Sequence, residues 1–573
     1  GLHFGLLPCK DGYVSISVRH ELTWEHLWMY LGDPDFAKDP RFDTAAKRRN
    51  NEPKLLEILL PLLARHTRHE LLTGLSPLRI LVGPANSIRD LIEDDHLKVR
   101  NSFFHYGSSS QPTMPSNPVR MTKTPWKFCN QAPEPIAVKL PNLDIRKNKV
   151  KSSFPVRGHG PLNGMRATVL TQAWAGAYCT QLLGDLGMEI LQVESVNRLD
   201  PWRGGVPPKL SGLYPDKIPG DSPWNRNALY NSVNRNKKGI TLDLNDTDCK
   251  SALLDMVSCS DLFVENFSGR VIGNLELGYE ILRKVNPSLI MLRMPTYGTY
   301  GPYSNFPGNG GTTEPVSGMS YLMGYEGGPP MNSGIMHTDA YSGILAAGAA
   351  VTALRHRLRT GEGQLIELSQ QESTVSLLAE YIMESSLSGE PLGRQGNSQR
   401  NAAPQGCYLS ADKAWIALTV FNQKNWITFC GAIARPDLIE DALFKDIESR
   451  TKNRKALDNI ISTIIGKRHS GEFSRKLRTL GIPCEIVQNT YEAAQSKDFK
   501  EMGMFEKVRH PDTGSFDHVS PPWIFSATPA RLEYPAPTLG QHTEEVLLSI
   551  VGWTSDKVAE LLASEHSGDS PIL

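Results

Sequence analysis

Short apolar runs separated by single amphipathic stretches dominate the chain from about residue 165 to residue 293. The apolar runs predict strands at 167–170, 189–193, 240–244, 262–266 and 289–293. Apolar residues three to four positions apart predict helices at 177–187 and near 247–258. Strands joined by single helices require crossover connections, so we expect an α/β fold with a doubly wound, mostly parallel, Rossmann-like sheet. Ligands of such sheets bind beyond the carboxyl ends of the strands.

The pattern differs on either side of this region. Residues 12–18 predict a strand, and helical spacing follows at 23–32 and 53–75. Residues 107–160 are rich in Ser, Pro, Asn and Lys, which predicts either a strap between two bodies or a disordered linker. Further segments have helical spacing at 340–356, 370–386, 542–551 and 555–563. Residues 359–364 are interpreted as a helix stop followed by a hairpin.

One pattern occurs twice, 402 positions apart. Trp24, Phe42, Arg48 and Asn51 recur as Trp426, Phe444, Arg450 and Asn453, and the apolar spacing of the helix after them also recurs. A long-range repeat indicates two copies of one folding unit. We therefore divide the chain into five regions. A small lobe at 1–125 is a partial first copy, and a strap at 126–160 follows it. A large domain at 161–385 and a smaller α+β domain at 386–526 form the complete copy, and a C-terminal segment at 527–573 returns to the large domain.

Composition narrows the possible partners. The 573 residues carry 61 basic and 61 acidic side chains, so charge steers the chain neither to nucleic acid nor to a membrane. No apolar run reaches the ~18 residues that span a bilayer. The eight cysteines are scattered without metal-ligand spacing, which predicts no metal site, no disulfide framework and a cytoplasmic location.

Asp339 is the main candidate for chemistry. It precedes an Ala-rich helical stretch, where an acidic residue commonly serves as a helix N-cap. A helix N-terminus also keeps a carboxylate ionised, and an ionised carboxylate can attack an activated acyl group. Both interpretations stay open on sequence alone. The turn at 172–178 follows the first predicted strand and is rich in small residues, which allows either close approach of a ligand or tight packing.

Several segments, taken in order, resemble the family III CoA-transferases, the group that includes formyl-CoA transferase and carnitine CoA-transferase. The matching segments are 161–164, 174–187, 234–244, 264–267, 297–302, 359–364 and 536–543, together with Asp339 and Gly343. The resemblance covers about 161–565 as a complete copy and 1–125 as an additional small lobe. The duplicated lobe is similar to tandem members of the family, such as the two-copy CoA-transferase that acts as a dimethylsulfoniopropionate lyase.

The resemblance implies transfer of CoA between an acyl-CoA and a carboxylic acid, with CoA as a substrate and no tightly bound cofactor. It places the nucleophile on Asp339, which forms a mixed anhydride with the acyl group. It places CoA contacts on Trp174 and Ala175 through close backbone approach, on Leu242, Asn266 and Phe267 at the adenine side, and on Tyr297 near the thioester. It also implies either a homodimer or a pseudo-dimer formed within one chain.

Some positions depart from the family pattern. A Lys and an Arg near the 3′-phosphate site of formyl-CoA transferase correspond to Asn245 and Asn274, for which Lys237, Lys238 or Arg270 are possible substitutes. Two alternatives therefore stand beside the transferase. One is a CoA-dependent lyase with Glu314 as a candidate base, although Glu314 could equally be an exposed loop acid. The other is a CoA-binding pseudoenzyme.

Overall fold

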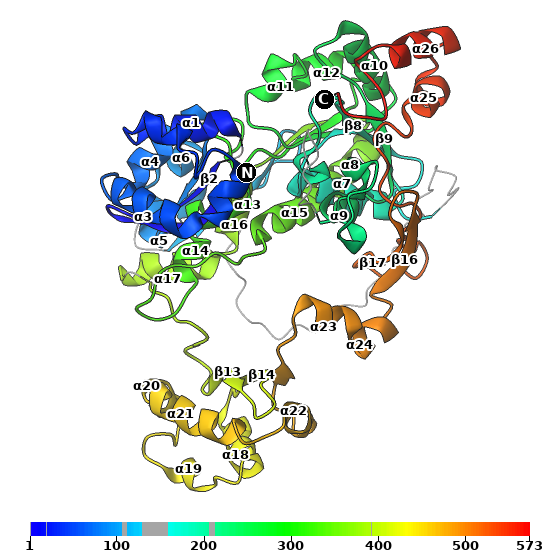
Figure 1. Cartoon of the computed structure of the whole chain (residues 1–573). Coiled ribbons are helices and arrows are strands. Elements are labelled where there is room, and N and C mark those ends of the chain that lie inside the picture. The colour runs from blue at the N-terminus through cyan, green and yellow to red at the C-terminus, as the bar shows by residue number, and fades with distance from the viewer. Residues whose placement is uncertain are drawn as a thin grey trace. The chain divides into compact units, whose positions relative to one another are not determined.

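The computed structural model describes residues 2–18, 20–105, 112–128, 159–204, 213–390 and 392–572, which form two compact units (Figure 1). The first unit contains Gly1–Ser320, Asn332–Leu392 and Phe505–Leu573, and the second contains Tyr321–Met331 and Gly393–Met504. The N-terminal lobe and the large domain thus belong to one unit. Most of the expected strap, residues 129–158, lies outside the described residues.

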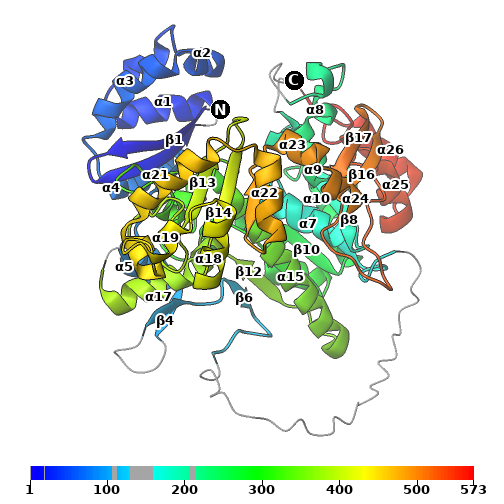
Figure 2. The same ribbon diagram turned by 90° about the horizontal axis from the view of Figure 1, so that it is seen from below.

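A seven-stranded sheet forms the centre of the first unit. Its strands in spatial order are β6 (Val119–Met121), β12 (Leu365–Leu368), β11 (Ile290–Arg293), β10 (Leu262–Glu265), β7 (Arg166–Leu170), β8 (Glu189–Glu194) and β9 (Lys237–Thr241). All neighbours pair in parallel except β6, which is antiparallel to β12 at the edge of the sheet (Figure 2). The expected doubly wound α/β fold is confirmed.

Alternation along the strands divides the core into two layers. In β7, Ala167 and Val169 pack with the helices α7 (Ala175–Asp185) and α15 (His337–Thr360). Leu170 at the end of the same strand packs in the opposite layer with the helices α10 (Thr247–Ser258), α12 (Tyr279–Val285), α25 (Thr543–Val546) and α26 (Ser555–Ala563). Figure 1 shows these two sets of helices on opposite faces of the sheet. Because both faces are covered, the central strands are continuous apolar runs.

The two small lobes have the same succession of elements. In the N-terminal lobe the three-stranded sheet is β1 (Leu2–Cys9), β2 (Gly12–Val18) and β3 (Leu81–Pro84). Its counterpart in the second unit is β13 (Gln405–Leu409), β14 (Trp415–Thr419) and β15 (Cys484–Ile486). The helices pair as α1 (Glu21–Tyr30) with α18 (Gln423–Ala432), α2 (Ala45–Asn50) with α20 (Ile447–Lys452), α3 (Glu52–Leu63) with α21 (Arg454–Ile465), α4 (Arg68–Leu75) with α22 (Ser470–Thr479), α5 (Ile88–Glu93) with α23 (Thr490–Gln495) and α6 (Asp95–Val99) with α24 (Lys497–Glu501).

A buried arginine explains why the repeated sequence positions are shared. Arg48 lies 4.1 Å from the Trp24 ring centroid and donates to the Phe42 carbonyl. Arg450 lies 4.8 Å from the Trp426 ring centroid and donates to the Phe444 carbonyl. A ring face and a carbonyl acceptor both stabilise a desolvated guanidinium, which explains the recurrence of Arg with Trp. The Phe42 and Phe444 side chains recur because each is buried in the core of its lobe.

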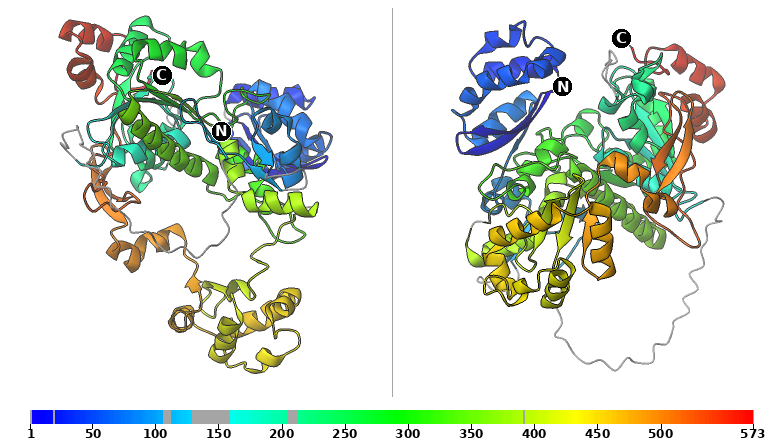
Figure 3. Two further views of the ribbon diagram at one scale, coloured as in Figure 1. Left: turned by 180° about the vertical axis from the view of Figure 1, so that it is seen from behind. Right: turned by 60° about the horizontal axis from the view of Figure 1, so that its bottom comes forward.

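The remaining elements of the first unit include β4 (Phe103–His105), β5 (Thr113–Pro115), β16 (Phe505–His510), β17 (Gly514–Val519), α13 (Gly310–Val316), α16 (Gln370–Ser376) and α17 (Ala379–Ser388). Figure 3 shows the N-terminal lobe in blue and the tail helices in red at opposite ends of this unit.

Several predicted boundaries were wrong. The helix expected at 53–75 is divided into α3 and α4, because Thr67 and Glu70 form a capping box that starts a new helix. The helix expected at 370–386 is likewise divided into α16 and α17. The hairpin expected after residue 359 is absent: α15 ends at Thr360, Gly361 forms its C-cap with a φ of +78°, and the chain then enters the parallel strand β12.

Candidate functional site

The predicted site residues of the large domain follow the carboxyl ends of the parallel strands. Trp174 and Ala175 follow β7, Leu242 follows β9, Asn266 and Phe267 follow β10, and Tyr297 follows β11. β7 is flanked by β8 on one side and by β10 on the other, so the strand order reverses at β7. A crevice opens at such a reversal in doubly wound sheets, and it is the usual place for a ligand.

Two side chains fix the turn between β7 and α7 from opposite sides. The Asn266 amide nitrogen donates to the Gln172 carbonyl over 2.8 Å, and the Gln172 amide donates to the Asn266 side-chain oxygen over 2.9 Å. On the other side, the Ala173 amide donates to an Asp200 carboxylate oxygen over 3.0 Å. Ala173 has φ +56°, a left-handed conformation that costs energy for a residue with a Cβ atom. The turn is therefore held in a strained shape by its neighbours.

Asp200 is a site residue that the sequence did not reveal. It lies after β8, is 3% exposed, and its second carboxylate oxygen accepts the Trp202 amide over 2.7 Å. Burial, together with the negative charge of Glu194, raises the pKa of the Asp200 carboxyl to about 6. Its connection to Ala173 joins two loops 27 residues apart, and no periodic pattern encodes such a contact.

Asp339 occupies the third position of α15 and is 9% exposed. The N-cap position belongs to Met336, so the interpretation of Asp339 as the N-cap is wrong. The carboxylate lies directly beside Gly310, the first residue of α13: a Cβ atom on Gly310 would come within 2.2 Å of Asp339 Oδ2. The missing side chain of Gly310 therefore leaves the space that the carboxylate occupies.

α15 packs closely on the first turn of α7. A Cβ atom on Gly343 would lie 2.8 Å from the Ala175 carbonyl oxygen and 3.3 Å from the Cys179 nitrogen. Asp339 precedes Gly343 by four residues and so lies on the same face of α15. The candidate nucleophile is thus within one helical turn of the contact with α7, whose N-terminus begins at the strained turn.

Glu314 holds the start of α15 and is not an exposed loop acid. It lies in α13, is 1% exposed, and accepts the Ser333 amide over 2.8 Å and the His337 amide over 2.9 Å. The Ser333 hydroxyl donates to the same carboxylate over 2.5 Å. Both carboxylate oxygens are engaged in fixing the helix N-terminus, which leaves little capacity for the role of a catalytic base.

The predicted CoA-contact residues differ in exposure. Trp174, Asn266 and Phe267 are partly exposed, and the Trp174 ring centroid lies 5.6 Å from that of Trp202. Ala175 and Leu242 are each 1% exposed, backbone included, so they lie beneath the surface that a ligand would meet.

The Tyr297 side chain is buried in the core of the N-terminal lobe. It is 1% exposed, and its hydroxyl donates to the Val82 carbonyl over 3.4 Å. His96 of the lobe contacts the Tyr297 carbonyl oxygen through Nε2 over 2.8 Å, and burial lowers the pKa of His96 to about 4. The expected position of the Tyr297 side chain near a thioester does not agree with this burial.

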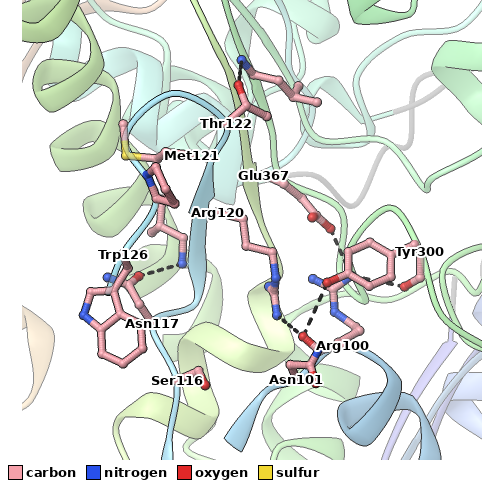
Figure 4. A pocket seen from close by; sticks show the side chains of 13 residues that line it. Arg100, Asn101, Ser116, Asn117, Arg120, Met121, Thr122, Trp126, Tyr300 and Glu367 are labelled. Carbon is pink, nitrogen blue, oxygen red and sulfur yellow. Dashed lines mark hydrogen bonds and ion pairs between the residues drawn. The ribbon is translucent and has the colours of Figure 1, made fainter. Parts of the chain in front are cut away.

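The N-terminal lobe is fastened to the large domain by a buried ionic cluster formed by Arg100, Arg120, Glu367 and Glu372. Arg100 lies 3.0 Å from Glu367 and 2.6 Å from Glu372, and Arg120 lies 2.5 Å from Glu372. Figure 4 shows Arg100, Arg120 and Glu367 of this cluster. A cavity of about 430 Å³ adjoins this cluster and Trp126. Its lining contains none of the predicted site residues, and its two arginines already have carboxylate partners.

The proposed substitutes for the missing basic residues are not equivalent. Asn245 and Asn274 are exposed. Lys237 is 3% exposed and donates to the Ala177 carbonyl and the Asn234 side chain, so it cannot reach a ligand. Lys238 forms ion pairs with Glu189 and Glu545. Arg270 alone of the three is exposed without an ion pair among the residues that the structure describes.

Across the residues described, none of the helices is long and apolar enough to cross a membrane.

Comparisons with known proteins agree with this architecture. The sequence profile of CoA-transferase family III matches residues 2–135 and 162–543. A succinyl-CoA:D-citramalate CoA-transferase of Chloroflexus aurantiacus is 29% identical over 403 residues, which are 70% of this chain and 97% of that protein. A succinyl-CoA:mesaconate CoA-transferase of Haloarcula hispanica is 30% identical over 402 residues, covering 68% of this chain and 96% of that protein. The crystal structure of a CaiB/BaiF family protein from Brucella suis superposes with a TM-score of 0.61 at 25% identity, over 68% of this chain and 99% of the other.

Proposed function

The chain belongs to CoA-transferase family III, and from this premise we propose that Asp339 is the group that accepts the acyl moiety of the donor acyl-CoA. The observation that supports the proposal is the placement of the Asp339 carboxylate. It lies beside Gly310, in the first turn of α15, and within one turn of the contact between α15 and the start of α7. A helix N-terminus favours the ionised, nucleophilic form of a carboxylate.

The reaction needs no oxidant, reductant or metal. The Asp339 carboxylate attacks the thioester carbonyl, the carbon–sulfur bond breaks, and CoA leaves as the thiolate. An acyl–aspartyl anhydride remains. The acceptor carboxylate then attacks the aspartyl carbonyl carbon, the bond from this carbon to the donor carboxylate oxygen breaks, and the donor acid leaves. The CoA thiolate attacks the acyl carbon of the acceptor in the new anhydride, which forms the new thioester and releases the Asp339 carboxylate. One thioester and one carboxylate enter, and one of each leaves.

The CoA moiety would lie across the strand ends. We assign the partly exposed side chains of Asn266 and Phe267 to the adenine side and Trp174 to close approach. Ala175 and Leu242 are assigned to the layer directly beneath these contacts, because each is 1% exposed. Asn266 has a second function in this arrangement, because it also holds the turn that approaches the ligand. Tyr297 is assigned no direct contact, because the whole residue is 1% exposed and its carbonyl oxygen contacts His96.

Small dicarboxylic acids are the first substrates to test. The two similar enzymes described above are named for succinyl-CoA and for a dicarboxylic acceptor. We therefore propose succinyl-CoA as the donor and C4 to C5 dicarboxylates as acceptors.

The N-terminal lobe supports a pseudo-dimer within one chain. The lobe packs on α13, which carries Gly310: the Asn86 side chain donates to the Val316 carbonyl over 3.0 Å, and the Asn86 amide donates to the Pro315 carbonyl over 3.1 Å. One chain thereby contains both the large domain of the complete copy and the small lobe of the partial first copy. Mass photometry at assay concentration tests whether the active species is a monomer.

The test of the function is an exchange assay with succinyl-CoA and a panel of acids, followed by mass spectrometry of all thioesters and acids. A transferase produces a new thioester and free succinate in equal amounts. An unsaturated or cleaved acyl product would instead identify the lyase. CoA binding without any exchange across the panel would identify the pseudoenzyme.

A further inference from the structure

Arg79 has an unfavourable backbone conformation that its counterpart in the second lobe avoids. Arg79 follows helix α4 of the N-terminal lobe and a short 3₁₀ turn (Ser76–Leu78), and its φ is +66°. The residue 402 positions later is Gly481, whose φ is +73°. Glycine adopts this left-handed conformation freely, whereas a residue with a Cβ atom is strained there. The backbone conformation therefore does not account for an arginine at this position, and we look for the reason in the contacts of its side chain.

The Arg79 side chain extends from the lobe to the carboxyl end of the large-domain sheet. Its guanidinium donates to the Asn305 carbonyl over 3.1 Å and contacts the Ser268 hydroxyl at 3.5 Å. Ser268 directly follows Asn266 and Phe267, the residues after β10. Arg79 thus reaches the same strand-end loop that carries two of the proposed CoA contacts.

The charges around Arg79 are positive. Arg270 lies in the same loop, two residues after Ser268, and Arg198 lies after β8. Burial and the charges of Arg270 and Arg198 lower the pKa of the Arg79 guanidinium, and among the residues that the structure describes no acidic group offsets them. Within the described part of the chain, no salt bridge involves any of these three arginines. Their mutual repulsion is relieved when an anion binds between them.

We propose that Arg79 of the N-terminal lobe forms, with Arg198 and Arg270, a site for a phosphate group of the CoA substrate. The proposal rests on the proposed function and extends it, because it assigns the additional lobe a direct part in substrate binding. Arginine suits this role since its planar guanidinium presents several donors to phosphate oxygens.

The test compares Arg79→Gly with wild type on three thioesters of the same acid: acyl-CoA, acyl-3′-dephospho-CoA and acyl-pantetheine, which has no phosphate. Glycine fits the left-handed backbone, so the thermal unfolding midpoint should be unchanged or higher. The KM for acyl-CoA should rise about 5- to 30-fold, the size expected for loss of one charged hydrogen-bonding partner. The KM for acyl-pantetheine should stay the same. The penalty should shrink at high salt because the arginines are partly exposed.

The control variants separate binding from folding. Arg79→Lys keeps the charge and should recover part of the affinity for acyl-CoA. Arg65→Gln removes an exposed charge of the same lobe and should change no KM value. If Arg79→Gly raises the KM for acyl-CoA but not the KM for acyl-3′-dephospho-CoA, the site binds the 3′-phosphate. If it raises both of these KM values but not the KM for acyl-pantetheine, the site binds the diphosphate.

Equal changes on all three thioesters, or no change on any of them, would overturn the proposal. Calorimetry with CoA and pantetheine distinguishes this failure from failure of the proposed function. If wild type binds CoA in an Arg79-dependent way but exchanges no thioester, the phosphate site stands and the transferase assignment fails. If the wild type exchanges thioesters and Arg79→Gly changes neither binding nor exchange, the transferase assignment stands and the phosphate site fails.

Discussion

Replacing Gly310 by alanine tests the geometry of the candidate nucleophile without altering any titratable group. The added Cβ atom would lie 2.2 Å from Asp339 Oδ2 and 2.5 Å from the Met336 Cβ atom. Real Cβ contacts are essentially never shorter than 3.0 Å, so the Asp339 carboxylate must retreat by about 0.8 Å. Because Met336 precedes α15 in a left-handed conformation, the start of the helix has little freedom to absorb this shift.

A displacement of this size at the reacting atom lowers catalysis much more than stability. A misplacement of about 1 Å can cost on the order of 100-fold in rate. We therefore expect kcat/KM for thioester exchange to fall about 100-fold in Gly310→Ala. Overpacking of a buried site costs roughly 1–3 kcal/mol of unfolding free energy, which denaturant titration measures.

Gly348→Ala is the matched control. Gly348 lies in α15, and a Cβ atom there meets nothing within 4 Å. Alanine in a helix interior should raise stability by roughly 0.5–1 kcal/mol and leave exchange unchanged. Wild-type activity in Gly310→Ala, with the variant folded, would refute the placement of a reactive carboxylate beside Gly310.

Two further substitutions test the support of the site. In the wild type, acidification through pH 6 protonates Asp200 and weakens its bond to the Ala173 amide, so the KM for acyl-CoA should rise about 10-fold between pH 7 and pH 5. In Asp200→Asn the KM should be higher than in the wild type at pH 7 and should not change with pH. A pH-dependent KM in that variant would contradict the role of Asp200. The raised pKa also means that the folded wild type takes up a proton between about pH 4 and pH 6, so its stability relative to Asp200→Asn should increase on acidification. Glu372→Gln leaves Arg100 and Arg120 without their shared carboxylate and should lower the unfolding free energy by about 3–5 kcal/mol, as followed by chemical denaturation. The exposed pair Lys123–Glu362 supplies the control, since Glu362→Gln should change stability by less than about 1 kcal/mol, and equal effects of the two variants would contradict the fastening role of the cluster.

The central strands of the sheet were predictable because each is a short run of apolar residues buried on both faces. The predicted strand at 262–266 agrees with β10 (Leu262–Glu265) for this reason. β9 begins at Lys237, three residues before the predicted strand, because the buried Lys237 side chain looks polar in sequence but is satisfied by internal acceptors. β6 was missed because its pairing partner Leu368 lies 249 residues from Val119.

The site was predictable only in part. Asp339 is singled out by its motif, yet nothing in the local sequence excludes the N-cap role that the structure assigns to Met336. The direction of the Tyr297 side chain depends on the N-terminal lobe that covers it. Asp200 and Arg79 act through contacts between distant loops, and such contacts have no signature in local residue spacing.

The most direct measurement of the proposed chemistry is a trap for the acylated enzyme. The protein is incubated with succinyl-CoA and hydroxylamine in the absence of an acceptor acid, digested, and mapped by mass spectrometry, with Asp339→Asn and CoA alone as controls. Formation of a hydroxamate on Asp339 in the wild type only, together with loss of exchange in Asp339→Asn, is the expected result. An unmodified Asp339 under conditions of turnover, or undiminished exchange in Asp339→Ala, would contradict the proposed nucleophile.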